Sequence, residues 1–327
     1  MANELLTPAV AVALILFAAA ALALASRQTR LRFDPAKVPL MGVLGAFVFA
    51  AQMINFPILP GTSGHLGGGV LLAILLGPHA ATLVMASILI VQCLIFQDGG
   101  LLALGANIIN LGIVPCYLGY ILFHGIAGAA PKAGRIYLAV FAATMIGMVA
   151  GAVLVPFEVS ISGVASVPIT EFLLVMIGLH LLVALGEAII TFLIVGYLCK
   201  VRPQVLGAVA DKLSAAGKGL SSGAVIGSVL VVALLLGGVF SLFASGSPDA
   251  LESITSLEDD TSKVLVKQNP DELTAKATEL QERIAFLPDY RWTSFSGMVG
   301  TIVTLLVVWG ISRILRGRNK HVAQITD

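Results

Sequence analysis

The side chains that could bind a ligand are few, and they lie at the ends of long apolar stretches. The run from Pro60 to His65 reads P-G-T-S-G-H. Its glycines, Gly64 among them, allow a tight turn, and the hydroxyls of Thr62 and Ser63 can satisfy exposed amides. The imidazole that ends the run suits Ni, Co, Cu and Zn. These residues alone leave two roles open for His65, a metal ligand or an ordinary loop residue.

A second group of polar side chains lies within or beside the apolar stretches. His180 and Glu187 are seven residues apart in one stretch, which places both on one face of a helix, two turns apart. Ionisable groups within a membrane span are costly, so they are usually paired or functional. We favour a hydrogen-bonded clamp between helices over direct metal ligation. The same interpretation applies to four further residues, Asn55, Asp98, Asn107 and Asn110.

Common catalytic and nucleotide-binding motifs do not occur in the sequence. Gly67 to Gly69 could suggest a phosphate-binding loop, but the Lys-Ser/Thr pair of a Walker A motif does not follow. G-x-S-x-G and H-E-x-x-H are also missing. Cys93, Cys116 and Cys199 each lie in an apolar stretch without a C-x-x-C pair, which favours buried hydrophobic positions over zinc or disulfide chemistry. We therefore expect no enzymatic activity.

The composition places the chain in a membrane. Of 327 residues, 58% are hydrophobic and 11% are charged, against about 25% charged residues in soluble domains. The net charge of +1 gives no reason to expect a polyanionic partner. The first apolar stretch follows an acidic start, which favours a transmembrane helix over a signal peptide. We expect a multi-pass protein of the inner (cell) membrane.

The apolar stretches predict an all-α transmembrane bundle with about nine helices, seven plus two. A helix needs about 20 apolar residues to cross the hydrocarbon. A short stretch, Leu66 to Leu76, is counted as a further span. Without it, the ends of the neighbouring spans could not be assigned consistently to the two sides of the membrane. The eight clear spans lie near residues 8–26, 38–57, 79–97, 101–123, 135–157, 170–199, 222–245 and 294–315.

The distribution of Lys and Arg predicts the orientation. With the N-terminus outside and nine spans, most of the 19 basic residues fall in inner loops, as the positive-inside rule requires. The remaining ones lie in the acidic segment 246–292, and long segments cross the membrane largely regardless of charge. The N-terminus, the loop from Phe56 to His65, the turn from Gln97 to Gly100 and the loop from Glu158 to Thr170 then face outward. A site built from them would take its ligand from outside.

Three regions follow from these boundaries. Residues 1–206 form a first transmembrane domain, 207–222 a small-polar cytoplasmic linker, and 223–327 a second module with two transmembrane helices around the extracytoplasmic segment 246–292. Within that segment Asn269, Pro270 and the acids after them predict a helix start. Apolar residues from Leu273 to Ile284 repeat at helical spacing, and we expect this amphipathic helix to lie against the outer face of the first domain.

Several strings in the chain resemble one known family. G-T-S-G-H-L-G-G-G, Q-D-G-G-L-L-A-L-G-A-N-I-I-N-L-G and H-L-L-V-A-L-G-E-A-I-I-T follow one another within about residues 5–202. They resemble the substrate-capture (S) component of cobalt/nickel energy-coupling factor (ECF) transporters, the CbiM/NikM family. The later S-P-D-A-L-E resembles the PDGLE or N-type (CbiN/NikN-like) module, here fused, with its motif altered at Ala250.

The resemblance implies a subunit that captures Ni²⁺ or Co²⁺ as transported substrate, with no catalytic cofactor. Its partners would be a transmembrane coupling subunit (EcfT/CbiQ-like) and cytosolic ATPases (EcfA/CbiO-like). The implied ligands are nitrogens: the terminal amine, here of Met1, the amide and imidazole of a His at the second position, and the loop imidazole, here His65. Because Ala2 has no imidazole, we expect the natural chain to begin with an additional Met-His.

Two alternatives to this function stay open from the residues. One is a self-sufficient permease or channel that needs no ATPase subunits, and the other is a membrane enzyme, which the lack of paired nucleophile and base disfavours. Nickel and cobalt are not distinguished, because the same nitrogen donors bind both. We also expect capture to weaken as the pH falls, because protons compete with the metal for imidazole nitrogen.

Overall fold

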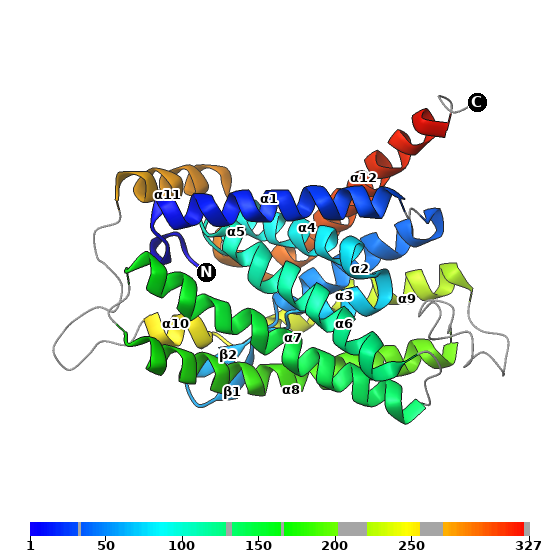
Figure 1. Cartoon of the computed structure of the whole chain (residues 1–327), viewed down its shortest axis with the longest axis horizontal. Coiled ribbons are helices and arrows are strands. Elements are labelled where there is room, and N and C mark those ends of the chain that lie inside the picture. The colour runs from blue at the N-terminus through cyan, green and yellow to red at the C-terminus, as the bar shows by residue number, and fades with distance from the viewer. Residues whose placement is uncertain (32–33, 129–132, 165–166, 202–220, 256–270, 324–327) are drawn as a thin grey trace.

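The protein is a bundle of apolar helices along one long axis (Figure 1). The computed structural model describes residues 1–31, 34–128, 133–164, 167–201, 221–255 and 271–323. Nine apolar helical segments run through this part of the chain. They are α1 (Pro8–Leu31), α2 (Val38–Gln52), α3 (Gly69–Leu76), α4 (Pro78–Phe96), the continuous helix α5 (Leu104–Asn107), η3 (Ile108–Ile113) and α6 (Val114–Ala127), α7 (Ala133–Ser162), α8 (Ile169–Val201), α9 (Ser222–Gly238) and α12 (Thr293–Ala323).

The predicted membrane bundle is confirmed, although several predicted boundaries were wrong. Six of the helices are long and apolar enough to cross a membrane, whereas α2, α9 and the eight-residue α3 are shorter. The span predicted over 38–57 ends at Gln52, since Pro57 and Pro60 disfavour helix there. The loop predicted from Glu158 begins only after Ser162, where α7 ends, so Glu158 is helical.

A small β-hairpin interrupts the helical fold between α2 and α3. β1 (Phe56–Leu59) and β2 (Thr62–Gly64) pair antiparallel around Gly61, whose φ of 79° favours glycine, so the predicted tight turn is present. A Cβ on Gly64 would lie only 2.6 Å from Val183 of α8. This residue must therefore be small for the hairpin to pack against the bundle.

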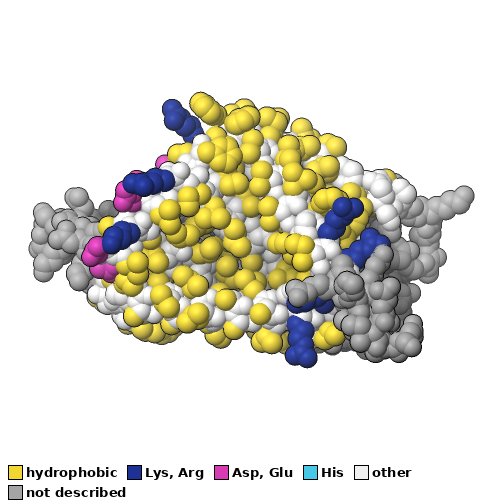
Figure 2. All heavy atoms as spheres, turned by 90° about the horizontal axis from the view of Figure 1, so that it is seen from above, with side chains coloured by type: hydrophobic (Ala, Val, Ile, Leu, Met, Phe, Trp, Pro, Cys, Tyr) yellow, Lys and Arg dark blue, Asp and Glu magenta, His cyan; other side chains and the backbone are white. Residues whose placement is uncertain are grey.

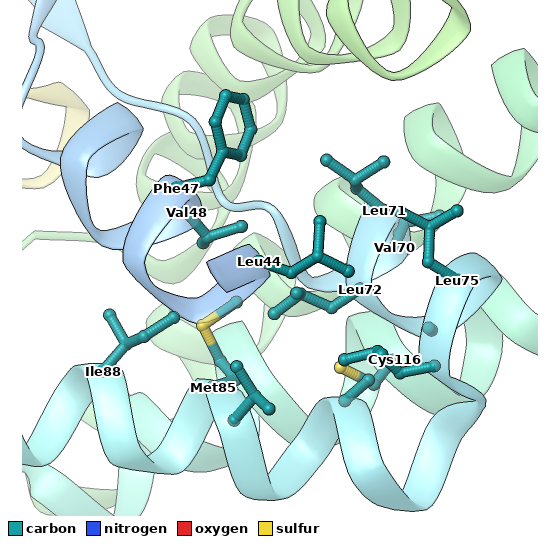
Figure 3. Close-up of a cluster of buried hydrophobic side chains, with 14 of the residues drawn as sticks. Leu44, Phe47, Val48, Val70, Leu71, Leu72, Leu75, Met85, Ile88 and Cys116 are labelled. Carbon is teal, nitrogen blue, oxygen red and sulfur yellow. The ribbon is translucent and has the colours of Figure 1, made fainter. Parts of the chain in front are cut away.

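The centre of the bundle is packed around α3. All eight of its residues are buried, and they contact side chains of α2, α4 and α6, including Leu44, Met85 and Cys116 (Figure 3). Cys93 and Cys116 are buried free thiols, as the sequence predicts for these two cysteines. A helix buried on every side is typical of the core of a larger bundle, and it explains why α3 has no polar face.

The C-terminal module is part of this bundle. α9 and α12 pack on α2, and a Cβ on Gly297 would overlap the carbonyl oxygen of Gly237, so the two helices touch backbone to backbone. Most of the linker predicted at 207–222 lies outside the described residues, although Ser222 already belongs to α9. The module nevertheless completes the wall around α2.

The surface is apolar between two polar ends. Figure 2 shows a wide hydrophobic band, with acidic and basic side chains at one end and only basic ones at the other. The C-terminal ends of α1 and α12 lie at one end of the bundle, and the N-terminus lies towards the opposite end (Figure 1). We refer to the latter as the N-terminal end.

Short helices cover the N-terminal end. They are η1 (Asn3–Leu5), α10 (Ala250–Thr255), α11 (Glu272–Ile284) and η6 (Pro288–Tyr290). α11 contacts η1 and α4, so the expectation that this helix lies on the first domain is confirmed. Its predicted start was wrong. Asp271 is the N-cap, and its carboxylate accepts hydrogen bonds from the amides of Leu273 and Thr274, while Asn269 and Pro270 lie outside the described residues.

The buried face of α11 also differs from the prediction. Thr274, Ala277 and Gln281 are buried, whereas Leu273 and Ile284 stay about half exposed. Apolar spacing indicated the helix correctly, but the helix turns a face with polar side chains towards the bundle. The reason is that Gln281 satisfies backbone groups there, as described below.

Candidate metal-capture site

Two hollows with shared lining residues lie towards the N-terminal end of the bundle. The central cavity has a volume of about 110 Å³ and lies between α7, α8 and the residues after β2. The second hollow, which we call the vestibule, has a volume of about 460 Å³ and lies among η1, the turn at 97–100 and η6. Met1, His65, Asp249 and Leu251 line both hollows. His65 therefore stands at the boundary between them.

The first residue of the chain is held inside this site. The amine of Met1 donates to Asn107 Oδ1 at 3.0 Å, and Asn107 Nδ2 donates to the Met1 carbonyl at 3.3 Å. The amide of Gly100 donates to the same carbonyl at 2.9 Å. Asn107, a predicted site residue, thus places the terminal amine in the cavity that His65 also lines.

Glu187 holds the chain directly after His65. Its two carboxylate oxygens accept hydrogen bonds from the amides of Gly67 and Gly68, at 2.6 and 3.0 Å, while Gln52 Nε2 donates to the Gly67 carbonyl at 2.7 Å. A carboxylate offers two acceptor atoms, whereas an amide side chain offers one. Glu187 therefore forms a hydrogen-bonded clamp, but this clamp joins α8 to a loop, whereas the sequence had predicted a clamp to another helix.

His180 does not form the interhelical clamp that the sequence suggested. Its Nδ1 bonds to the carbonyl of Met176, four residues earlier in the same helix, at 2.8 Å. The side chain nevertheless lines the central cavity, as does Glu187, so the prediction that both lie on one helix face is correct. The physical reason for the difference is that one turn of helix already offers the imidazole a carbonyl partner.

The C-terminal module closes the site over the hairpin. The amide of Ser63 donates to the Pro248 carbonyl at 2.8 Å, and its hydroxyl donates to the Ser247 carbonyl at 2.6 Å. The amide of Ser245 donates to the carbonyl of Asn55 at 2.7 Å. The Ser63 hydroxyl thus joins the two modules, whereas we had expected it to satisfy amides within the turn. Thr62 is half-buried in β2.

The vestibule is built by contacts between distant polar residues. Gln281 Nε2 donates to the carbonyls of Cys93 and Gly99 at 3.0 and 2.7 Å, and its Oε1 accepts from Asn3 Nδ2 at 3.1 Å. The hydroxyl of Tyr290 donates to the carboxylate of Asp98. Burial and the nearby Asp98 carboxylate raise the pKa of Tyr290 well above 10, so the phenol stays neutral and can donate.

Asn110 and Glu158 form a buried pair between helices, of which the sequence indicated only Asn110. Asn110 Nδ2 donates to Glu158 Oε2 at 2.7 Å, and Asn110 also lines the central cavity. Glu158 was predicted to lie in a loop, and for this reason it was not recognised as a buried partner. If the helix is continued to Ser162, Glu158 falls on the same helix face as Val155. The only sequence signal for Glu158 was therefore the helical spacing of residues beyond the predicted end of the helix.

The donors in this site are of mixed chemical type. Within the described ranges, no group of three or more His, Cys, Asp or Glu side chains is arranged to hold a metal ion. Backbone, amine or thioether donors must therefore complete any metal site here. Imidazole and amine nitrogens beside an accessible cavity suit borderline divalent ions such as Ni²⁺ and Co²⁺.

The comparison with known proteins agrees with this chemistry. Residues 1–205 match the family described as the cobalt uptake substrate-specific transmembrane region, CbiM, and residues 223–317 match the PDGLE domain. The chain belongs to the CbiM family. It is a cobalt/nickel transport membrane protein in which a CbiM region is joined to a PDGLE domain, and it is not an enzyme.

Relatives of this fused CbiM chain include proteins with both regions. NikMN of Archaeoglobus fulgidus is 34% identical over 279 residues, which cover 85% of this chain and 86% of that protein. The fused nickel transport protein NikMN of Rhodobacter capsulatus is 31% identical over 182 residues, or 52% of each chain. A crystal structure of a transition metal transporter has a TM-score of 0.56 and 28% identity, covering 65% of this chain and 99% of its own.

Proposed function

We propose that this chain is the substrate-capture subunit of an ATP-driven ECF-type importer for Ni²⁺ or Co²⁺. The observation that carries the proposal is that Met1, whose amine is held by Asn107, and His65 line the same cavity. These residues are distant in sequence, and both are nitrogen donors that bind such ions. The ion would be held by nitrogens of the N-terminal segment and by His65, with Asn107 and Glu187 positioning the two parts.

In this proposal the N-terminal end of the bundle faces outside and the chain crosses the membrane nine times. The Lys and Arg side chains that Figure 2 shows at the opposite end support this orientation, because Lys and Arg concentrate on the cytoplasmic side. The vestibule would then admit the ion from the external medium. The acidic side chains Asp98 and Asp249 at its walls would favour a cation there.

Release to the inside would need partner subunits. The sequence has no Walker A motif, so the energy for import would come from cytosolic ATPases through a transmembrane coupling subunit. Uptake of ⁶³Ni into vesicles that contain the purified chain alone separates this proposal from a self-sufficient permease. We expect capture without net flux, and rapid flux without ATPases would overturn the need for partners.

Metal binding by purified protein tests the site itself. Isothermal titration with Ni²⁺ and Co²⁺ should show one high-affinity site in the wild type and the loss of that high-affinity binding in His65→Ala. The wild type and His65→Ala should each be measured with Met1 as the first residue and with Met-His added before Met1, because the added imidazole is expected to raise the metal affinity. Affinity should also fall from pH 8 to pH 5, since protons compete for the nitrogens, and a flat profile would remove His65 from the site.

A further inference from the structure

The central cavity has further donor side chains besides His65 of the proposed capture site. Met176, His180 and Glu187 lie on one face of α8, at spacings of four and seven residues, and all three line the cavity. Met148 of α7 lines it as well. The cavity therefore combines an imidazole and two thioethers with the buried carboxylate of Glu187.

The ring of His180 is held by a hydrogen bond within α8. Its Nδ1 lies 2.8 Å from the Met176 carbonyl, which can only accept a hydrogen bond, so Nδ1 carries the proton and Nε2 has a free lone pair. Metal-binding histidines commonly donate their other nitrogen to a carbonyl in this way, which fixes the ring and its tautomer. His180 and His65 both line the central cavity.

The two hollows differ in which of these donors line them. His65 lines both the vestibule and the central cavity, whereas His180, Met148, Met176 and Glu187 line only the central cavity. An ion that leaves the vestibule past His65 would therefore meet them next. The cavity volume of about 110 Å³ is several times the roughly 15 Å³ that one water molecule requires.

We propose that His180 Nε2 and the thioethers of Met148 and Met176 form a second metal station, which receives the ion from the His65 site. This inference rests on the proposed import function. Imidazole and thioether are neutral, borderline-to-soft donors, which bind Ni²⁺ and Co²⁺ and prefer Cu⁺ and Ag⁺. The ion stays divalent, ligand exchange is the only chemistry, and the nearby carboxylate of Glu187 offsets part of its charge.

A soft probe ion separates this station from the capture site. Full-length protein in detergent, with Cys93, Cys116 and Cys199 changed to Ala in every variant so that thiols do not bind the probe, is titrated with Ag⁺ and, separately, with Ni²⁺. In His65→Ala we expect Ni²⁺ capture to be lost and Ag⁺ binding to persist. Combining His65→Ala with His180→Ala and Met176→Leu should weaken Ag⁺ binding about tenfold or more. Unchanged Ag⁺ affinity in that triple variant would overturn the second station.

His124→Ala is the matched control for His180→Ala. His124 Nδ1 bonds to the carbonyl of Tyr120, four residues earlier, at 3.0 Å, so it makes the same intrahelical contact without lining either hollow. Leu replaces Met176 with nearly the same volume, which preserves packing. An equal loss of Ag⁺ binding in His124→Ala would assign the effect to helix stability and reject the station.

Transport in cells with the partner subunits tests the route. His180→Ala should lower ⁶³Ni uptake about tenfold or more, while Ni²⁺ capture by the purified variant stays near that of the wild type. Wild-type uptake would show that the ion does not pass this station. If His65→Ala keeps normal Ni²⁺ capture, the proposed function fails, whereas the Ag⁺ titration still decides whether the station exists.

Discussion

The two modules of this protein contribute to the site in different ways. The N-terminal module supplies the side chains of His65, His180, Met148 and Met176, which are the nitrogen and sulfur donors of the central cavity. The C-terminal module supplies the backbone carbonyls of residues 247 and 248 that hold the hairpin, and part of the cavity wall at 249–251. The proposed metal donors thus belong to one module, while the other supplies backbone contacts that hold the hairpin.

This division explains how two separately recognised sequence regions form one working unit. A loop that carries a metal ligand must be ordered before the ion binds, or the ordering entropy reduces affinity. Glu187 orders the loop from within the N-terminal module, and the Ser63 contacts order it from the C-terminal module. Substitutions in the two modules should therefore change metal affinity by different amounts.

The largest effect is expected from the donor in the N-terminal module. His65→Ala removes an imidazole, and Ni²⁺ affinity measured by titration should fall by more than the roughly 100-fold limit seen for outer-shell partners. His124→Ala, on α6, should bind like the wild type. Comparable loss in both variants would mean that His65 acts through folding rather than through ligation.

Loss of the Glu187 clamp should have the next largest effect. In Glu187→Gln one of the two glycine amides loses its acceptor, so Ni²⁺ affinity should fall roughly 10- to 100-fold. Glu171→Gln is the control, because Glu171 lies exposed in the first turn of the same helix. Wild-type affinity in Glu187→Gln would show that the loop is ordered without the carboxylate.

A substitution within the C-terminal module should act on assembly more than on metal affinity. Gly297→Ala adds a methyl group where α12 meets α9, which should destabilise the protein by about 1–3 kcal/mol. Gly310→Ala on the same helix has open space around its Cβ. Thermal unfolding in detergent measures the difference, and equal stability of the two variants would contradict the tight α9–α12 contact.

The smallest effect is expected at the junction of the modules. Ser63→Ala removes one hydrogen bond to the Ser247 carbonyl, worth about 1 kcal/mol, or about fivefold in Ni²⁺ affinity. Ser228→Ala removes a hydrogen bond within α9 and should leave affinity unchanged. An effect of Ser63→Ala as large as that of Glu187→Gln would show that the two modules share the ordering of the loop equally.

The sequence by itself determined the membrane bundle, the turn before His65 and the family. Apolar runs and turn residues act locally, so each stretch carries its own signal. The eight-residue α3 was counted among the spans although its length is far short of a crossing, because the connectivity of its neighbours required it. Local patterns also predicted that His180 and Glu187 share one helix face.

Only the tertiary structure decided which polar groups meet. Met1 and Asn107 are 106 positions apart, and Ser63 and Ser247 are 184 apart, so no local period relates them. The burial of Gln281 in place of Leu273 on α11 has the same cause. A buried polar group needs a specific partner, and that partner is chosen by the packing of distant helices rather than by neighbouring residues.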